Sequence, residues 1–574
     1  MRVRRTAAVL LLVAPPFFAA ASGRAQAGLE DACQEKVTLE DACLAEVSPE
    51  EAIAEHASPE RVSLDDASLE NAGLTVGTIT VDTSDVFEDD GETTKLVFRL
   101  ADKLHVTTHD GVLRRQLVLR PGDPYSGARR RESERILRTN AYLYDAELRP
   151  VRVHDGVVDM VLKTRDVWTT RFGIGFGRAG GVNKTHLGIE DANFLGTGKQ
   201  VALRRTSDVD RVETVIGYRD DGLFGSRYRT ELAHANNSDG VRNALRFERP
   251  FFSLDARWTA GVQASDDQRV DSLWSLGQVE SSFGHHERDA DLWAGWSKGL
   301  RGASALRWTA GFSLREDVFE TLPAGGAPAP PDRRLAYPWI AVEHVRDGYV
   351  ALQNLDKIHK TEDINLAPTW RARLGYASPA FGSDRAEAVL DSGASGGRAL
   401  GGGRMLLLDA SATGRAGSQG PKNAVAEGGA RFVVPDFKQH GNLVMWLRGT
   451  FAHDLDPENR LLLGGDTGLR GYPLRYAYGD RAGLIGIEQR LYGDRQWLHL
   501  LRVGAAAFAE MGYVSGGDAP ASNLGVLRDV GLGLRLGSSR SSHGAMIHID
   551  VAFPLDAAGD QRHPQFLVST GDTF

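Results

Sequence analysis

Apolar and polar residues alternate along most of this chain. From Thr169 onward, segments of about ten residues carry apolar side chains at every second position and are separated by turn residues. In one segment Leu306, Trp308 and Phe312 fall on one face, and Arg307 lies on the other. A strand with one apolar and one polar face suits the wall of a membrane-spanning barrel. The pattern therefore predicts a mostly β protein built on a transmembrane antiparallel β-barrel.

Turns recur with a regular period in the first part of this region. The segments Asn193–Gly196, Gly222–Gly225 and Pro250–Ser253 begin 29 and 28 residues apart. This period fits two strands plus two turns, and the aromatic residues are typical of an interfacial belt. A propeller or repeat protein is the competing interpretation, which the change of spacing after Asp255 disfavours.

Strand counting gives up to twenty candidates. The candidates that raise the number lie near 271–315 and 363–378. Residues 321–334 and the glycine-rich residues 382–404 are predicted to be long loops, the second of them mobile. An even number of strands is expected for a single-chain barrel.

Residues 74–168 show the pattern of a small α+β domain instead. The second of its long helices carries a cluster of arginines, Arg129, Arg130, Arg131 and Arg135. Such a cluster is typical of a solvated helix face, and docking on anionic lipid head groups or on an acidic client is the functional alternative. The predicted elements are a strand over 74–81, a short helix marked by Leu96, Leu100 and Leu104, a helix over 112–116 capped by Thr108, a helix capped by Ser126, and a hairpin of strands over 142–153 and 157–164.

The N-terminus has the pattern of an export signal. Arg2, Arg4 and Arg5 precede an apolar run that is followed by Ala25-Gln26-Ala27. This predicts a signal peptide over residues 1–27. No later stretch approaches the roughly 20 apolar residues of a spanning helix.

Residues 28–73 are acidic and carry thirteen acids against Lys36 and Arg61. An acid-rich segment poor in aromatic residues predicts a flexible linker, and a partner-binding arm is the alternative. Cys33 and Cys43, the only cysteines, recur in a ten-residue repeat. A helix would hold them about 15 Å apart, so a disulfide requires a loop, and both states stay open.

One arginine stands among glycines in the stretch from Gly464 to Pro473. A loop folded into a barrel lumen could bring Arg470 against Glu510, which lies on a strand two segments downstream. A guanidinium and a carboxylate form a bidentate pair that is strong away from water. The residues predicted to form this lumen lock are Arg470, Gly471, Tyr472, Phe508, Glu510 and Gly512.

These two motifs resemble the Arg-Gly-Phe/Tyr loop and the Phe-x-Asp-x-Gly strand of the BamA/TamA superfamily of outer-membrane insertases and translocators. Glu510 stands where that pattern has Asp. The segments 120–125 and 141–143 resemble the loops of a POTRA domain, the periplasmic module of the same superfamily. The resemblance implies one POTRA domain over 74–168 and a barrel over 169–574 with sixteen strands. It also implies an outer-membrane protein of the BamA/TamA or surface-antigen type, with the POTRA domain in the periplasm.

The two ends of the barrel region form a candidate seam. The first strand places Phe172 and its alternate neighbours toward lipid and has glycine at Gly173, Gly175 and Gly177 on the opposite face. A seam with a glycine-faced strand is expected to be weak, although the glycines could merely suit a crowded lumen. The last strand resembles the C-terminal β-signal by which barrels are recognised for insertion, through Phe566, Val568 and the terminal Phe574.

Enzyme-like motifs are weak. The segment 196–200 looks like the tail of a phosphate loop but is interpreted as a hairpin turn. The run His285-His286-Glu287 is interpreted as an exposed polar turn, because adjacent histidines on a strand point to opposite sides. We therefore expect no enzyme, no cofactor and no metal.

The resemblance implies a protein that inserts or translocates polypeptides at the outer membrane through a weak seam. The expected partners are outer-membrane lipids, client polypeptides and a periplasmic protein, with no nucleic acid. A passive pore or structural barrel is the first alternative, and a lipid-modifying barrel enzyme is the second.

Overall fold

The computed structural model describes residues 65–84, 106–323, 328–357, 360–435, 440–497, 501–516, 524–538, 546–556 and 562–570. All of them belong to one compact unit, Arg61–Phe574. The predicted signal peptide, most of the acidic segment with Cys33 and Cys43, the predicted helix at 96–104 and Phe574 lie outside the described residues.

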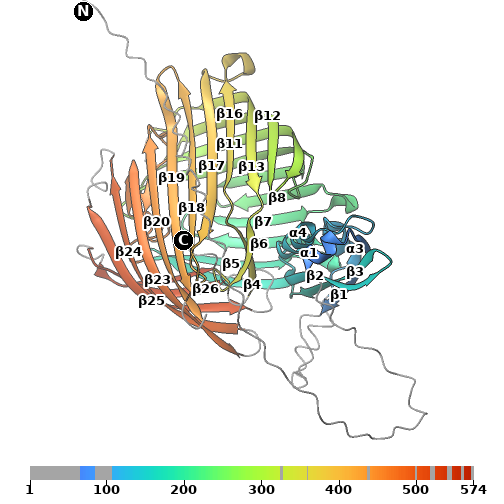
Figure 1. Cartoon of the computed structure of the whole chain (residues 1–574). Coiled ribbons are helices and arrows are strands. Elements are labelled where there is room, and N and C mark those ends of the chain that lie inside the picture. The colour runs from blue at the N-terminus through green and yellow to red at the C-terminus, as the bar shows by residue number, and fades with distance from the viewer. Residues whose placement is uncertain are drawn as a thin grey trace, which may run out of the picture. The chain divides into compact units, whose positions relative to one another are not determined.

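Twenty antiparallel strands close into a barrel in which each strand pairs with the next and the last pairs with the first (Figure 1). The predicted barrel is confirmed, and its strand number matches the upper candidate count rather than sixteen. The strands are β4 (Thr170–Ala179), β5 (Val182–Asp191), β6 (Lys199–Ser207), β7 (Val212–Asp220), β8 (Arg229–Asn237), β9 (Gly240–Arg249), β10 (Trp258–Ser275), β11 (Gln278–Arg301), β12 (Ser304–Thr321), β13 (Arg333–Arg346), β16 (Thr369–Ala377), β17 (Glu387–Ala399), β18 (Met405–Gly417), β19 (Gly420–Pro435), β20 (Gly441–His453), β23 (Arg481–Trp497), β24 (Leu501–Ser515), β25 (Val526–Ser538), β26 (Met546–Pro554) and β27 (Gln565–Thr570).

The alternation of the sequence becomes the two faces of the barrel wall. On β12, Leu306, Trp308 and Phe312 are exposed on the outer face, whereas Arg307 and Ser313 are buried on the lumen side. Side chains of successive strand residues point to opposite faces, so one period-two pattern fixes both surfaces. The outer wall is therefore apolar and the lumen polar, as in a membrane barrel.

The glycine-rich stretch at 382–404 is not the long loop that its composition predicts. Most of it forms β17, which pairs with β16 and pairs along its whole length with β18, from Glu387↔Gly417 to Ala399↔Met405. Backbone hydrogen bonds to two neighbours outweigh the poor strand propensity of its small residues. The prediction of a loop is wrong for this reason.

Turns that follow β5, β7 and β9 lie at one end of the barrel, called the near end below. Two of them contain short 3-10 turns, η1 (Phe194–Gly196) and η2 (Leu223–Gly225), in which Leu195 and Phe224 both have φ 53°. The third lies at 250–257. The predicted turns are confirmed, and the opposite end of the barrel is called the far end.

A small α+β domain precedes the barrel and has a three-stranded sheet in the order β1-β3-β2. Strand β3 is parallel to β1 and antiparallel to β2. Leucines from the helices and the sheet, such as Leu113, Leu137 and Leu162, form its fully buried core. The elements are α1 (Asp66–Asn71), β1 (Thr75–Ser84), α3 (Asp110–Gln116), α4 (Gly127–Arg138), β2 (Leu143–His154) and β3 (Val157–Asp166).

The two predicted helix caps differ in outcome. The Ser126 hydroxyl accepts a hydrogen bond from the Arg129 amide and caps α4, as predicted. Thr108 does not cap α3, whose N-cap is His109. Thr108 instead donates its amide and hydroxyl to the buried Asp166 carboxylate, at 2.7 and 2.9 Å. No helix in the described part of the chain has the length and apolar character needed to cross a bilayer.

Two arginines of the α4 cluster contact segments that connect barrel strands. Arg129 pairs with Asp255 at 3.6 Å, and Arg135 lies 4.0 Å from the Tyr349 ring. Arg130 pairs with Asp66 inside the domain, and only Arg131 of the cluster is well exposed, at 61%. The interpretation as a solvated helix face is therefore wrong for most of the cluster.

Candidate functional site: an arginine loop inside the barrel

A long loop joins β20 to β23 at the far end and folds into the lumen. It contains a short strand pair, β21 (Leu461–Leu463) and β22 (Ala477–Gly479), and between them the glycine-rich stretch with Arg470. Gly468 has φ 111°, and a Cβ there would collide with Leu484. Glycine is therefore required where the loop reverses against the wall.

Arg470 makes three contacts with Glu510 of β24. Its amide donates to Oε2 at 3.0 Å, its Nε donates to Oε1 at 2.8 Å, and its Nη2 lies 2.7 Å from Oε1. Both side chains are almost completely buried, with residue exposures of 1% and 3%. A carboxylate that takes both the backbone and the guanidinium of one residue fixes the position and the orientation of that residue.

Two further carboxylates contact the same guanidinium. Arg470 Nη1 donates to Glu488 of β23 at 2.9 Å and to Asp550 of β26 at 3.0 Å. Arg535 of β25 bridges these two acids, at 3.0 Å from Glu488 and 2.5 Å from Asp550. Arg490 completes the cluster with a 2.9 Å hydrogen bond from its Nε to Glu488. The loop is thus tied to four consecutive barrel strands.

Arg470 also stabilises the barrel wall, through the acidic residues that face it. Glu510 and Asp529 are directly opposite each other on β24 and β25. Two acids opposed across adjacent strands repel each other when both are ionised. The guanidinium of Arg470 lies against Glu510, while the amide of Gly471 donates to Asp529 at 2.8 Å. The loop therefore supplies the hydrogen bonds that keep both buried acids in place.

Other residues of the predicted lock line the site in which the loop packs, called its seat below. The guanidinium carbon lies 3.3 Å from the centre of the Phe508 ring, a cation–π contact. Tyr472 is fully buried, and its hydroxyl donates to the Arg528 carbonyl and accepts from the Arg528 amide, at 3.0 and 3.1 Å. A Cβ at Gly512 would lie 2.8 Å from Leu469. All six residues predicted for the lumen lock thus lie together around one seat.

From the far end, the loop also reaches hairpin tips on the other side of the seam. The Leu474 amide donates to the Gly180 carbonyl at 3.2 Å, in the turn between β4 and β5. Arg475 pairs with Asp210, between β6 and β7, at 2.7 Å. One loop is therefore attached to β24, β25 and β26 on one side and to the first hairpins on the other.

Within the described residues, the junction between β27 and β4 is short. Among the described residues a single register pair, Val568↔Arg178, joins these strands, whereas β26 and β27 pair over six positions from Ile547↔Thr570. A Cβ at Gly177 would lie 3.1 Å from the Val568 carbonyl oxygen.

The remaining seam residues lie along these two strands. Phe172, Gly173 and Gly175 pair through their backbones with β5, and their side-chain surroundings lie outside what the structure describes. Phe566 is exposed on the outer face, as is Phe176. The predicted seam residues that the structure describes therefore lie on the first and last strands of the barrel.

Two enzyme-like motifs have structural explanations. The segment Gly196–Gln200 is the turn into β6, as predicted. His285 is not in an exposed turn: it lies within β11 at 6% exposure, between Asp271 at 2.7 Å and Asp317 at 3.2 Å. The long hairpin of β10 and β11 extends further than the polar residues suggested. Within the described ranges no group of three or more His, Cys, Asp or Glu side chains could hold a metal ion.

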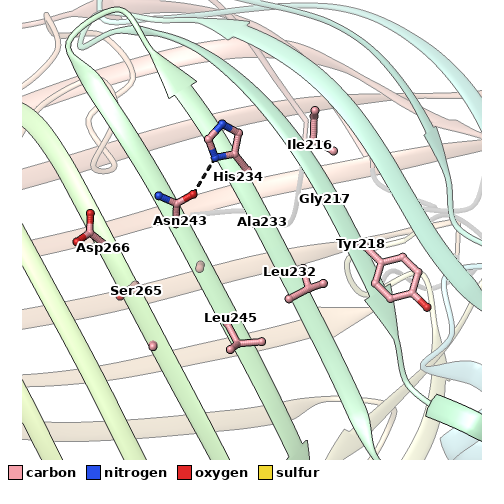
Figure 2. A pocket seen from close by; sticks show the side chains of 12 residues that line it. Ile216, Gly217, Tyr218, Leu232, Ala233, His234, Asn243, Leu245, Ser265 and Asp266 are labelled. Atoms are coloured by element: carbon pink, nitrogen blue, oxygen red, sulfur yellow. Dashed lines mark hydrogen bonds between the residues drawn. The ribbon is translucent and has the colours of Figure 1, made fainter.

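A hollow of about 540 Å³ on the outer wall does not form a second candidate site. Figure 2 shows Leu232 and Leu245 on adjacent strands there, with a 2.7 Å hydrogen bond between His234 and Asn243. Both leucines are exposed, at 46% and 42%. The hollow is a shallow apolar surface of the kind that a membrane barrel presents to lipid.

Sequence reasoning missed Glu488, Arg490, Asp529, Arg535 and Asp550. Each is a charged residue on a strand that otherwise alternates with apolar outward residues, so its lumen position could have been inferred. Which of these charges meet depends on strand register, which the alternation alone does not determine.

No protein-family model matches this chain. A curated protein of Treponema pallidum (strain Nichols), described as "Putative outer membrane protein assembly factor", is 28% identical over 195 residues. The match covers 31% of this chain, and the chain spans only 22% of the length of that relative.

Three solved structures show a low likeness to this chain. BamA from Haemophilus ducreyi lacking POTRA domains 1–3 has 13% identity and a TM-score of 0.40 over 87% of this chain and 85% of that chain. CdiB from Acinetobacter baumannii has 12% identity and a TM-score of 0.42 over 87% of this chain and 73% of that chain. CdiB from Escherichia coli has 14% identity and a TM-score of 0.41 over 86% of this chain and 75% of that chain. These identities and TM-scores are too low to support an argument about this chain. Its fold is therefore described from its own strand pairing.

Proposed function

We propose that this chain is an outer-membrane barrel of the BamA/TamA type that inserts or translocates polypeptides through the junction of β27 and β4. The α+β domain would be a periplasmic POTRA domain. The observation that carries the proposal is the short junction itself, closed by Val568↔Arg178 within the described residues. The relative described as an outer membrane protein assembly factor supports the same location and the same class of function.

A short junction suits this activity for a physical reason. Unpaired N–H and C=O groups at an open strand edge are costly in lipid, each by several kcal/mol. An incoming client strand can satisfy them by edge-to-edge pairing, which needs no catalytic side chain. The fewer hydrogen bonds the closed junction holds, the smaller the cost of exchanging them for a client.

The Arg470 loop connects the strands on the two sides of this junction. The loop is bound to Asp550 on β26 and Glu510 on β24, and its Leu474 amide is bound to Gly180 at the tip of the first hairpin. These contacts lie on both sides of the junction. We infer that a seated loop favours the closed barrel and that release of the loop lowers the cost of opening.

The proposal is tested with vesicles that contain the purified full chain. An unfolded outer-membrane barrel client is added, and its insertion is followed by heat-modified gel mobility and by protection from external protease. We expect faster insertion than in empty vesicles. Insertion at the rate of empty vesicles, with the chain itself folded, would refute the proposed function.

A passive pore is the second candidate function, and the lumen favours it in one respect. Two cavities of about 600 and 470 Å³ lie in the part of the lumen lined by β9–β19, with charged residues such as Arg307, Arg373 and Asp291 around them. Solute efflux from the same vesicles separates the two functions. Efflux without client insertion would support the pore.

A further inference from the structure

A second element enters the lumen, from the near end. Between β13 and β16 the chain forms a hairpin of β14 (Tyr349–Gln353) and β15 (Thr361–Asn365), which pair with each other and not with the barrel wall. Its tip residue Leu355 is 3% exposed and packs against Val433 and Val444 on the inner wall. The tip is therefore seated inside the barrel rather than in solvent.

The tip residues Leu355–Lys357 have a defined conformation. The Glu362 carboxylate, on β15, accepts hydrogen bonds from three successive amides, those of Leu355, Asp356 and Lys357, at 2.9 to 3.2 Å. Glu362 is itself buried, at 8% exposure. Three amides held by one carboxylate fix Leu355–Lys357 to β15, so a displacement of β15 is transmitted to these residues.

The tip contacts the cluster that holds Arg470. Arg490 donates to the Leu355 carbonyl at 3.0 Å and lies 3.5 Å from the Asp356 carboxylate. The same arginine donates to Glu488, which in turn accepts from Arg470 at 2.9 Å. Arg490 is 1% exposed, so its orientation depends on these partners rather than on water.

The stem of the hairpin is held by the α+β domain. Arg138, in the last turn of α4, makes a bidentate pair with Asp363 of β15, at 2.8 and 2.7 Å. Thr361 donates to Asp145 at 3.2 Å, and the buried Lys360 ammonium donates to the Leu143 carbonyl at 3.4 Å. The hairpin therefore has one end on the domain and the other on the arginine cluster.

We propose that the β14–β15 hairpin couples the α+β domain to the Arg470 loop, with Asp356 and the Leu355 carbonyl as positioning groups for Arg490. The continuous path runs from Arg138 through Asp363 and the rigid tip to Arg490, and from there through Glu488 to Arg470. A domain that moves when it engages a client would shift the hairpin and weaken the seat of the loop. The inference rests on the proposed function, because it assigns a regulator to the same loop.

Hydrogen exchange in the full chain, folded in lipid, tests the coupling. The reporters are the amides of Arg470 and Gly471, which donate to Glu510 and Asp529 and should exchange slowly. We expect Arg138→Ala to speed their exchange about tenfold, within what the loss of charged hydrogen bonds allows. Asp363→Asn, a milder change in the same contact, should act in the same direction.

Helix α4 offers a matched control. Arg129→Ala removes another arginine that joins α4 to a barrel turn, through Asp255 at 3.6 Å, but not through the hairpin. We expect at most about a twofold change at the reporter amides. The reversed pair Arg138→Glu with Asp363→Arg should restore part of the protection.

Two results would overturn the coupling. One is unchanged exchange in Arg138→Ala and Asp363→Asn while Glu510→Gln, the direct disruption, speeds it. The other is an equal effect of Arg129→Ala, which would indicate general loosening of the domain. Client insertion is measured separately, so a coupled loop in a chain that inserts nothing would refute the proposed function and leave the coupling standing.

Discussion

Replacement of Arg470 by alanine should destabilise the barrel far more than an ordinary loop substitution. The variant leaves Glu510 without its only ion pair among the described residues, directly opposite Asp529. Glu488 and Asp550 lose one partner each but both keep Arg535. Removing one member of a buried pair typically costs about 3–5 kcal/mol, because the remaining charge is buried without compensation.

The same loop provides a control. Arg475 pairs with Asp210, and the two side chains are 21% and 33% exposed. A partly exposed pair is typically worth about 0–1 kcal/mol. Glu510→Gln should fall between the two, at about 1.5–3 kcal/mol, because Arg470 keeps Glu488 and Asp550.

Urea unfolding of the lipid-reconstituted chain measures these differences, with heat-modified gel mobility as the signal of the closed barrel. The midpoint should fall while the slope stays constant, which indicates a loss of stability rather than a different denatured state. The reasoning is refuted if Arg470→Ala lies within about 1 kcal/mol of Arg475→Ala. A Glu510→Gln variant that matches wild type in gel mobility and client insertion would refute the lock as well.

Two further predictions concern the loop and the domain. Gly471→Ala would place a Cβ 2.7 Å from the Cβ of Asp529, so we expect a loss of about 1–3 kcal/mol in the same urea assay; an unchanged midpoint would show that the loop is not seated there. In the domain, burial would raise the pKa of Asp66, but hydrogen bonds from Arg130 and Tyr125 outweigh burial and lower that pKa below 3.8. A lowered carboxyl pKa stabilises the fold above the unfolded value and is lost as pH falls through the folded value. Asp66→Asn should therefore speed hydrogen exchange of α1 at pH 7, and the difference from wild type should shrink as pH falls through the lowered pKa of Asp66; a difference that is independent of pH would contradict this.

The sequence was sufficient for the barrel because period-two alternation fixes which face of each strand meets lipid. It also identified Arg470 and Glu510, since an arginine among glycines and an acid on a strand are visible in one dimension. The partners Arg535 and Asp550 were not predicted. They come together through register across several strands, which depends on the whole ladder.

Local composition led to a wrong prediction in two places. Residues 382–404 are rich in glycine and serine, yet pairing with β16 and β18 makes most of them a strand. The arginine cluster of α4 was expected to face water, but the turn with Asp255 lies against Arg129 and the hairpin with Tyr349 lies against Arg135. Both errors arise from long-range neighbours that local composition does not contain.

The central claim is that the junction of β27 and β4 opens when the chain works, and a reversible covalent closure tests it most directly. Arg178→Cys and Val568→Cys are combined in a chain with Cys33→Ser and Cys43→Ser. The two positions are register partners, and such partners lie about 4.5–5.5 Å apart between Cα atoms, within reach of a disulfide. We predict that oxidation abolishes client insertion in vesicles and that reduction restores it. Full insertion by the oxidised, quantitatively cross-linked chain would contradict the account.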